Sequence, residues 1–126
     1  MSDFKLAIAL LIIIFVFSYI YLRVLDNTTD TFVAEIEKLE KSVKQNKWEE
    51  AEKQLNEIQK KWSKTERWMT PLIDHQEIDN IKLTLARLSQ YIHGRENTDF
   101  MAESASLKLL IHHIYSKERI SWQNIF

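Results

Sequence analysis

The chain has 126 residues, with one Gly, one Pro and no Cys, and its 17 Lys and Arg nearly balance its 18 Asp and Glu. The lack of Cys excludes a disulfide framework and a Cys-based zinc site, and a single Gly excludes a Gly-rich phosphate loop. A net charge of -1 argues against a nucleic-acid partner held by bulk positive charge.

An uncharged apolar segment runs from Leu6 to Leu22 near the N-terminus. With its apolar flanks it reaches about 20 residues, the length that a helix needs to cross about 30 Å of hydrocarbon. Tyr19 and Tyr21 lie near its end, where aromatic rings favour the membrane interface. A cleaved signal peptide has a shorter apolar core and an Ala-x-Ala-like site, which this segment lacks. The sequence therefore predicts a transmembrane signal anchor over residues 1–26, in contact with the lipid bilayer.

The membrane side of the remaining chain is predicted from its flanks. Lys5 precedes the apolar segment and Arg23 follows it, so the positive-inside rule sets one residue against one. A short N-terminal tail before a larger C-terminal region is typical of a signal anchor. We therefore expect a single-pass cell-membrane protein with an extracytoplasmic domain over residues 27–126, which the lack of Cys permits.

Four amphipathic helices are predicted within residues 27–126, because apolar residues recur every three or four positions. The first spans about residues 29–45, either after a break or directly continuous with the apolar segment. The second starts at Lys47, and Asn46 with Glu49 has the form of a capping box.

The third and fourth helices have their own start and stop signals. Thr70-Pro71 predicts the start of the third, and Gly94 its end in a left-handed conformation. Asn97 or Thr98 caps the fourth. The expected apolar face of the fourth consists of Met101, Ala105, Leu109 and His112 or His113, widened by Leu107, Leu110, Ile111 and Ile114. The apolar residues near the C-terminus, expected to dock onto the bundle, are Ile120, Trp122, Ile125 and Phe126.

These elements predict an all-α fold. It consists of an N-terminal transmembrane helix followed by a small bundle of about four antiparallel helices, arranged as two helical hairpins.

The densest polar cluster lies between Asp74 and Asp79. On a helix, His75 and Asp79 share a face, and Glu77 lies nearby. These three side chains are the candidates for a metal site or an acid-base pair. The alternatives are a first turn whose acidic residues favour the positive helix end, and a partner-binding patch that includes Asp74, His75 and Glu77.

Three Trp residues lie close together in the sequence. Trp48 and Trp62 fit the apolar stripe of the second helix and are expected in the core. Trp68 lies off that stripe, and with Arg67 it is a candidate partner-binding anchor, because Trp and Arg are enriched at interface hot spots. The alternative is that Trp68 covers the corner between the second and third helices.

Several short sequence motifs that follow the apolar segment resemble those of a known family. They are Trp48-Glu-Glu-Ala, Thr65-x-x-Trp68, Leu72-Ile-Asp-His-Gln-Glu-Ile-Asp-Asn-Ile81, Leu85-Ala-Arg-Leu88 and Leu109-Leu-Ile-x-His113-Ile. The whole chain resembles a family of small single-pass membrane proteins of unknown function from Bacillus and Clostridium relatives. The resemblance implies a cell-membrane location and another integral membrane protein as partner, and it supplies no catalytic residues.

The sequence carries no recognisable catalytic signature, and no cofactor is expected. The function predicted is that of a non-enzymatic accessory or interaction subunit of a membrane protein complex. The alternative is a metal-dependent or ligand-sensing envelope protein that uses the cluster from Asp74 to Asp79. A ligand-sensing protein is expected to have its pocket between the third and fourth helices.

Overall fold

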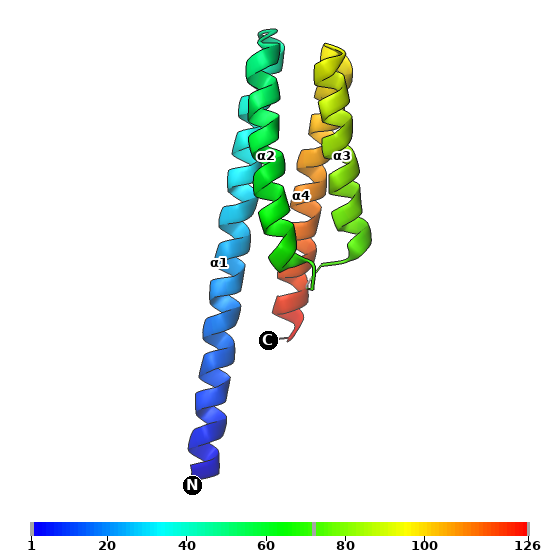
Figure 1. Cartoon of the computed structure of the whole chain (residues 1–126). Coiled ribbons are helices and arrows are strands. Elements are labelled where there is room, and N and C mark those ends of the chain that lie inside the picture. Colours follow the sequence, from blue (N-terminus) through cyan, green and yellow to red (C-terminus); the bar gives the residue numbers. More distant parts are fainter. Residues whose placement is uncertain (1, 72, 126) are drawn as a thin grey trace.

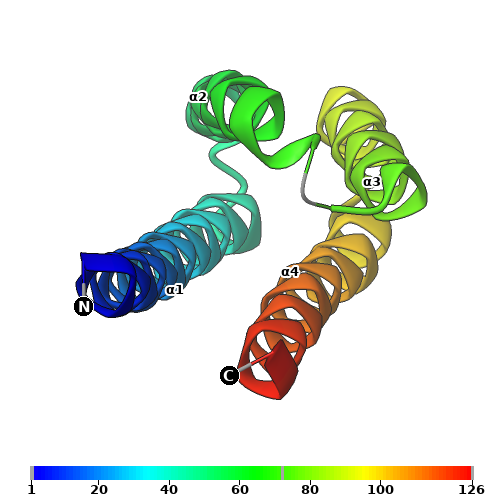
Figure 2. The ribbon, with the colours of Figure 1, turned by 90° about the horizontal axis from the view of Figure 1, so that it is seen from below.

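We describe a computed structural model of residues 2–71 and 73–125, with the side chains of residues 115 and 118–125 outside the description. Its helices are α1 (Ser2–Lys44), α2 (Trp48–Met69), α3 (His75–His93) and α4 (Asn97–Ile125). They run alternately up and down (Figure 1). α1 and α3 each pack against α2 and α4, which gives an up-down-up-down four-helix bundle (Figure 2). The predicted all-α bundle of antiparallel helices with a long apolar first helix is confirmed.

Helix α1 is continuous from the apolar segment into the bundle. Its sequence contains neither Gly nor Pro, so nothing interrupts the backbone hydrogen-bond ladder between Leu22 and Thr29. The apolar segment projects beyond the other helices (Figure 1). Leu25 is the first core residue of α1, and Tyr21, one turn earlier, is half-buried against the core. Of the two connections that the sequence left open, the structure has the direct one.

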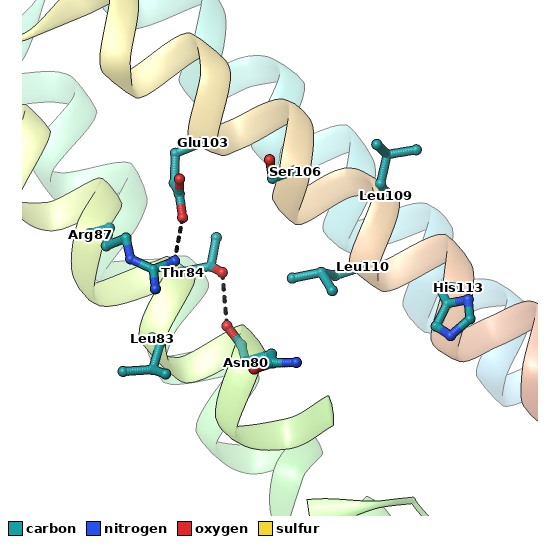
Figure 3. Close-up of a pocket in the computed structure, with 9 residues that line it drawn as sticks. All are labelled: Asn80, Leu83, Thr84, Arg87, Glu103, Ser106, Leu109, Leu110 and His113. Carbon is teal, nitrogen blue, oxygen red and sulfur yellow. Dashed lines mark hydrogen bonds and ion pairs between the residues drawn. The ribbon is translucent and has the colours of Figure 1, made fainter. Parts of the chain in front are cut away.

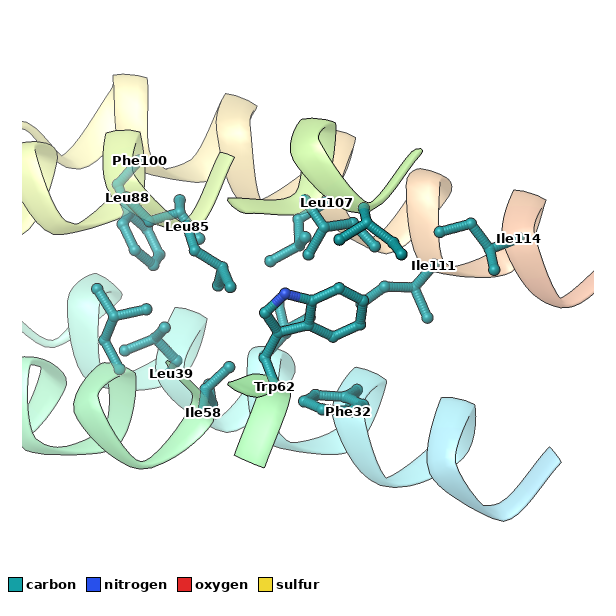
Figure 4. Packing of buried hydrophobic residues seen from close by; sticks show 14 of the residues in the cluster. Phe32, Leu39, Ile58, Trp62, Leu85, Leu88, Phe100, Leu107, Ile111 and Ile114 are labelled. Carbon is teal, nitrogen blue, oxygen red and sulfur yellow. The ribbon is translucent and has the colours of Figure 1, made fainter. Parts of the chain in front are cut away.

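The bundle core is built from residues spaced three or four apart on every helix. Trp62 of α2 lies at its centre, with Phe32 of α1 edge-on to the indole at a centroid distance of 5.9 Å (Figure 4). Trp48 is half-buried against the same core, and Met69 is buried at its lower end. The predicted core positions of α2 are therefore confirmed for Ala51, Leu55, Ile58 and Trp62.

The apolar face of α4 is centred on different residues from those that the sequence predicted. Its buried positions are Phe100, Ser104, Leu107, Ile111 and Ile114. Leu107, Ile111 and Ile114 were predicted on the apolar face and are confirmed there, and Met101 and Leu110 are half-buried against the core. Leu109 is 71% exposed, and Ala105, His112 and His113 are also exposed, so the prediction was wrong for these four residues. The predicted stripe through Met101 and the observed stripe through Phe100 both have helical spacing. The packing of Phe100 beside α1 and α3 selects the observed one. The predicted docking of Ile120, Trp122, Ile125 and Phe126 lies outside the described residues and side chains.

Helices α1 and α3 both end with a residue in the left-handed backbone conformation. At the end of α1, Asn46 has φ 58°, and the Lys47 N–H donates to the Ser42 carbonyl at 2.9 Å. This is a Schellman motif, so Asn46 ends α1 instead of capping α2, and the predicted capping box was wrong. At the end of α3, Arg95 takes the left-handed conformation with φ 54°, whereas Gly94 stays right-handed at −81°. The left-handed role predicted for Gly94 therefore falls to the next residue.

The third helix starts later than the sequence indicated. Thr70 extends α2, because its N–H and its hydroxyl both donate to the Glu66 carbonyl. Pro71 has no N–H with which to continue the ladder. Asp74 caps α3 by accepting a hydrogen bond from the Gln76 N–H at 3.0 Å. The start predicted at Thr70-Pro71 was wrong because a better N-cap follows.

A buried carboxylate joins α1 to α4. Glu40 is 7% exposed, and it accepts hydrogen bonds from the Ser104 hydroxyl and the Lys108 ammonium, each at 2.8 Å. Nearby, the Asn97 side chain donates to the Val43 carbonyl at 3.0 Å. Because a buried charge is costly without partners, these contacts specify the register of α1 against α4.

The phase of α4 can be tested with two alanine variants of the full chain in detergent micelles. Phe100→Ala leaves a cavity in the core, so we expect it to lower the free energy of unfolding by about 3–5 kcal/mol. Leu109→Ala removes an exposed side chain and should change it by less than about 0.5 kcal/mol. Urea unfolding followed by circular dichroism measures both. Equal losses, or a larger loss for Leu109→Ala, would contradict the observed phase.

Candidate functional site

The predicted polar cluster lies at the start of α3. Asp74 is occupied as the N-cap, and His75 opens the helix with an exposed side chain. Asp79, one turn further along, is also exposed. Asp74 therefore has a structural role in starting α3, while the other two side chains face solvent.

Glu77 points in a different direction from its neighbours in sequence. It lies two residues from both His75 and Asp79, a spacing that places side chains on opposing sides of a helix. Its carboxylate lies 3.5 Å from Nε2 of His113 and 3.4 Å from Nζ of Lys117, both on α4. Within the part of the chain that the structure describes, no group of three or more His, Asp or Glu side chains is placed to hold a metal ion.

The other predicted contact residues lie in the last turn of α2. Trp68 is 39% exposed and Arg67 is exposed beside it. Met69, the next residue, lines a small cavity together with Leu25 and Thr28 of α1. The end of α2 therefore lies level with the point where α1 enters the bundle.

A groove lies between α3 and α4, the helix pair at which a pocket was expected for a ligand-sensing protein. It has a volume of about 450 Å³, and Leu83 of α3 and Leu109 of α4 flank it (Figure 3). Leu83 is 54% exposed and Leu109 is 71% exposed, so both present apolar surface to solvent. Leu110 contributes further apolar surface within the groove. We call the surface formed by these three leucines, Arg87 and Glu103 the α3–α4 face.

Charged and polar groups border the leucines on this face. Arg87 Nη1 lies 2.8 Å from Oε1 of Glu103, which closes the groove at one end. The hydrogen bond and charge of Glu103 raise the pKa of Arg87 above its usual value. Asn80 and His113 border the other end. An apolar centre with a polar rim is the usual layout of a protein contact surface.

Only half of this face had a signal in the sequence. Leu83 falls between the core positions Ile81 and Leu85, so an apolar residue off the stripe could have indicated it. Leu109 had been assigned to the core through the wrong phase of α4.

Ion pairs also link the other helix pairs. Lys61 of α2 bonds Glu35 of α1, and Lys82 of α3 lies 2.6 Å from Glu66 of α2. The hydrogen bond and charge of each carboxylate raise the pKa of its lysine above 10.5. These lysines are exposed, so each pair contributes modestly to stability and is screened by salt.

These pairs predict a loss of stability at alkaline pH. A raised pKa in the folded state gives stability that is complete below 10.5 and is lost as pH rises through the folded value. We therefore expect the free energy of unfolding to fall as the pH rises above about 10.5. The double variant Lys61→Met, Lys82→Met should show a shallower fall in matched urea titrations. An identical pH profile for both proteins would count against a contribution from these pairs.

Comparison with known proteins gives one result that covers most of the bundle. No curated protein and no solved structure shows significant similarity to the chain. A family model described as a domain of unknown function, DUF4363, matches residues 19–125, from the end of the apolar segment to the end of α4. The origin in Bacillus or Clostridium relatives that the resemblance implied stays a prediction. The chain belongs to the DUF4363 family, whose function is unknown.

Proposed function

We propose that this chain is a membrane-anchored, non-enzymatic accessory subunit that stands beside another integral membrane protein. The observation that carries the proposal is the N-terminal half of α1, which is long and apolar enough to cross a membrane. Its apolar side chains are exposed all round the helix, as the consecutive residues Leu10, Leu11, Ile12 and Ile13 illustrate. A helix docked on a soluble partner needs only one apolar stripe, whereas one in lipid is apolar on every side.

The continuity of α1 supports a fixed position of the bundle above the bilayer. Leu22 ends the uncharged segment and Leu25 is already buried in the bundle, so no linker separates them. The end of α2 lies level with Leu25 and Thr28, which is about 5–10 Å along the helix from Leu22. Arg67 and Trp68 are therefore held near the headgroup layer, where they would meet the membrane-proximal surface of a neighbouring protein.

The same end of the bundle carries the other predicted contact residues. The α2–α3 connection brings Asp74 and His75 to this end, and His75 is exposed there. Glu77 is held by α4, so Trp68 and Arg67 form the centre of the proposed contact. Trp and Arg supply large contact areas and directed hydrogen bonds in such anchors.

The direct test is affinity purification of the full chain from native membranes in mild detergent. We expect a stoichiometric integral membrane protein to follow it. Trp68→Ala should reduce recovery of that protein at least about tenfold, the loss expected for a hot-spot residue. Lys53→Ala, an exposed change in the upper half of α2, is the matched control and should retain recovery.

Two results would overturn this proposal. One is a solitary chain whose recovery pattern is the same for wild type, Trp68→Ala and Lys53→Ala. The other is a stoichiometric metal ion in the purified chain that His75→Ala removes, which would favour the metal-dependent alternative.

Anchoring and orientation can be measured together, because the chain has no Cys. We expect a single-cysteine variant, Lys60→Cys, to stay with the membrane pellet after alkaline extraction. An extracytoplasmic bundle predicts that a membrane-impermeant maleimide labels it in intact cells. Release by alkali would refute the anchor, and labelling only after lysis would place the bundle on the cytoplasmic side.

A further inference from the structure

Residues of α3 and α4 lie at matching heights along the α3–α4 face. Arg87 of α3 pairs with Glu103 of α4, and Glu77 of α3 pairs with His113 of α4. Because α3 and α4 are antiparallel, these pairs mark two heights along the bundle. Leu83 and Leu109 each lie between the two pairs in sequence, so they share a height and flank one groove.

We propose that this face binds the same face of a second copy of the chain, related by a two-fold axis parallel to the helices. The direction of the axis rests on the proposed anchoring. Two copies anchored in one membrane with the same orientation are related by an axis along the membrane normal, which is also the direction of the bundle.

This operation preserves height and places α3 of one copy opposite α4 of the other. Leu83 then meets Leu109 of the second copy, so the most exposed apolar side chains of the described bundle cover each other. Arg87 likewise meets Glu103 of the second copy, since the two residues already lie at one height within each chain. The ion pair between Arg87 and Glu103 is thus repeated as a complementary pair between copies, which favours this register.

The available area is compatible with such a contact. Helix α3 has 19 residues and is about 28 Å long, and two adjacent helices present a width of about 20 Å. The two copies would together bury on the order of 1,100 Å², near the lower limit for a specific interface. Anchoring in a shared membrane raises the effective concentration of the second copy and favours a contact of this size.

Cysteine cross-linking in membranes tests the arrangement directly. Two differently tagged full-length copies are coexpressed, one with Leu83→Cys and the other with Leu109→Cys, and the membranes are oxidised. We expect a mixed disulfide between the tags, because the proposed contact brings these positions to disulfide distance. Each variant expressed alone should give little disulfide, since like positions lie diagonally across the axis.

The matched control pair is Glu37→Cys with Lys60→Cys, on α1 and α2, the two helices that do not form the α3–α4 face. Both side chains are exposed. They lie at a similar height to Leu109, because Ile36, Ile58 and Leu107 line one small internal cavity. This pair should give at least about tenfold less mixed disulfide than the Leu83–Leu109 pair, since only close positions can be bridged.

The contrary outcomes are equally specific. Equal yields from the test and control pairs would reflect random collision and overturn the interface. Efficient disulfides from Leu83→Cys alone would indicate a two-fold axis perpendicular to the helices. Capture of a different protein at Leu109→Cys would assign the face to another partner. Either result overturns the proposal. The alkaline extraction of Lys60→Cys reports on the anchor separately from these yields.

A mass measurement on the cysteine-free chain completes the test. The wild-type chain in detergent should have twice the protein mass of Leu109→Glu, which places a carboxylate in the apolar contact. Because Leu109 is exposed in the single chain, circular dichroism should show an unchanged fold. A monomeric wild type, or a dimeric Leu109→Glu, would contradict the proposed contact.

Discussion

The continuity of helix α1 is the constraint on which the rest of the structure depends. The apolar segment and the first bundle helix form one rod, so the orientation of one fixes the orientation of the other. The stripe that begins at Leu25 then determines which sides of α1 receive α2 and α4. The end of α2 and the α2–α3 connection consequently lie at the end of the bundle nearest the apolar segment (Figure 1).

Polar contacts set the register that apolar packing leaves free. Stripes of Ile and Leu at three- and four-residue spacing permit neighbouring helices to slide by a turn, because each turn resembles the next. Glu40 removes this freedom between α1 and α4, since only one register gives its buried carboxylate both Ser104 and Lys108. Arg87 with Glu103 restricts α3 against α4 in the same way, although that pair is more exposed.

The candidate contact surfaces differ in how far the sequence revealed them. Trp68 was identified because a Trp off the helical stripe has no place in the core, and the structure leaves it partly exposed. The cluster from Asp74 to Asp79 was read as a possible unit, yet α3 directs Glu77 toward α4 while Asp74 caps the helix. A pocket between the third and fourth helices was expected for a ligand-sensing protein. Its flanking residues Leu83 and Leu109 were not identified, because two helices that are separate in sequence create the groove.

The sequence by itself determined the apolar segment, the number of bundle helices and most of their buried positions, because length and period are local properties of the chain. The tertiary structure decided the phase of α4, where Phe100 is buried and Leu109 exposed although both fit a helical stripe. It also decided the burial of Glu40 and the left-handed positions of Asn46 and Arg95. These features depend on which neighbour a side chain meets, and a residue meets that neighbour only after the four helices have packed.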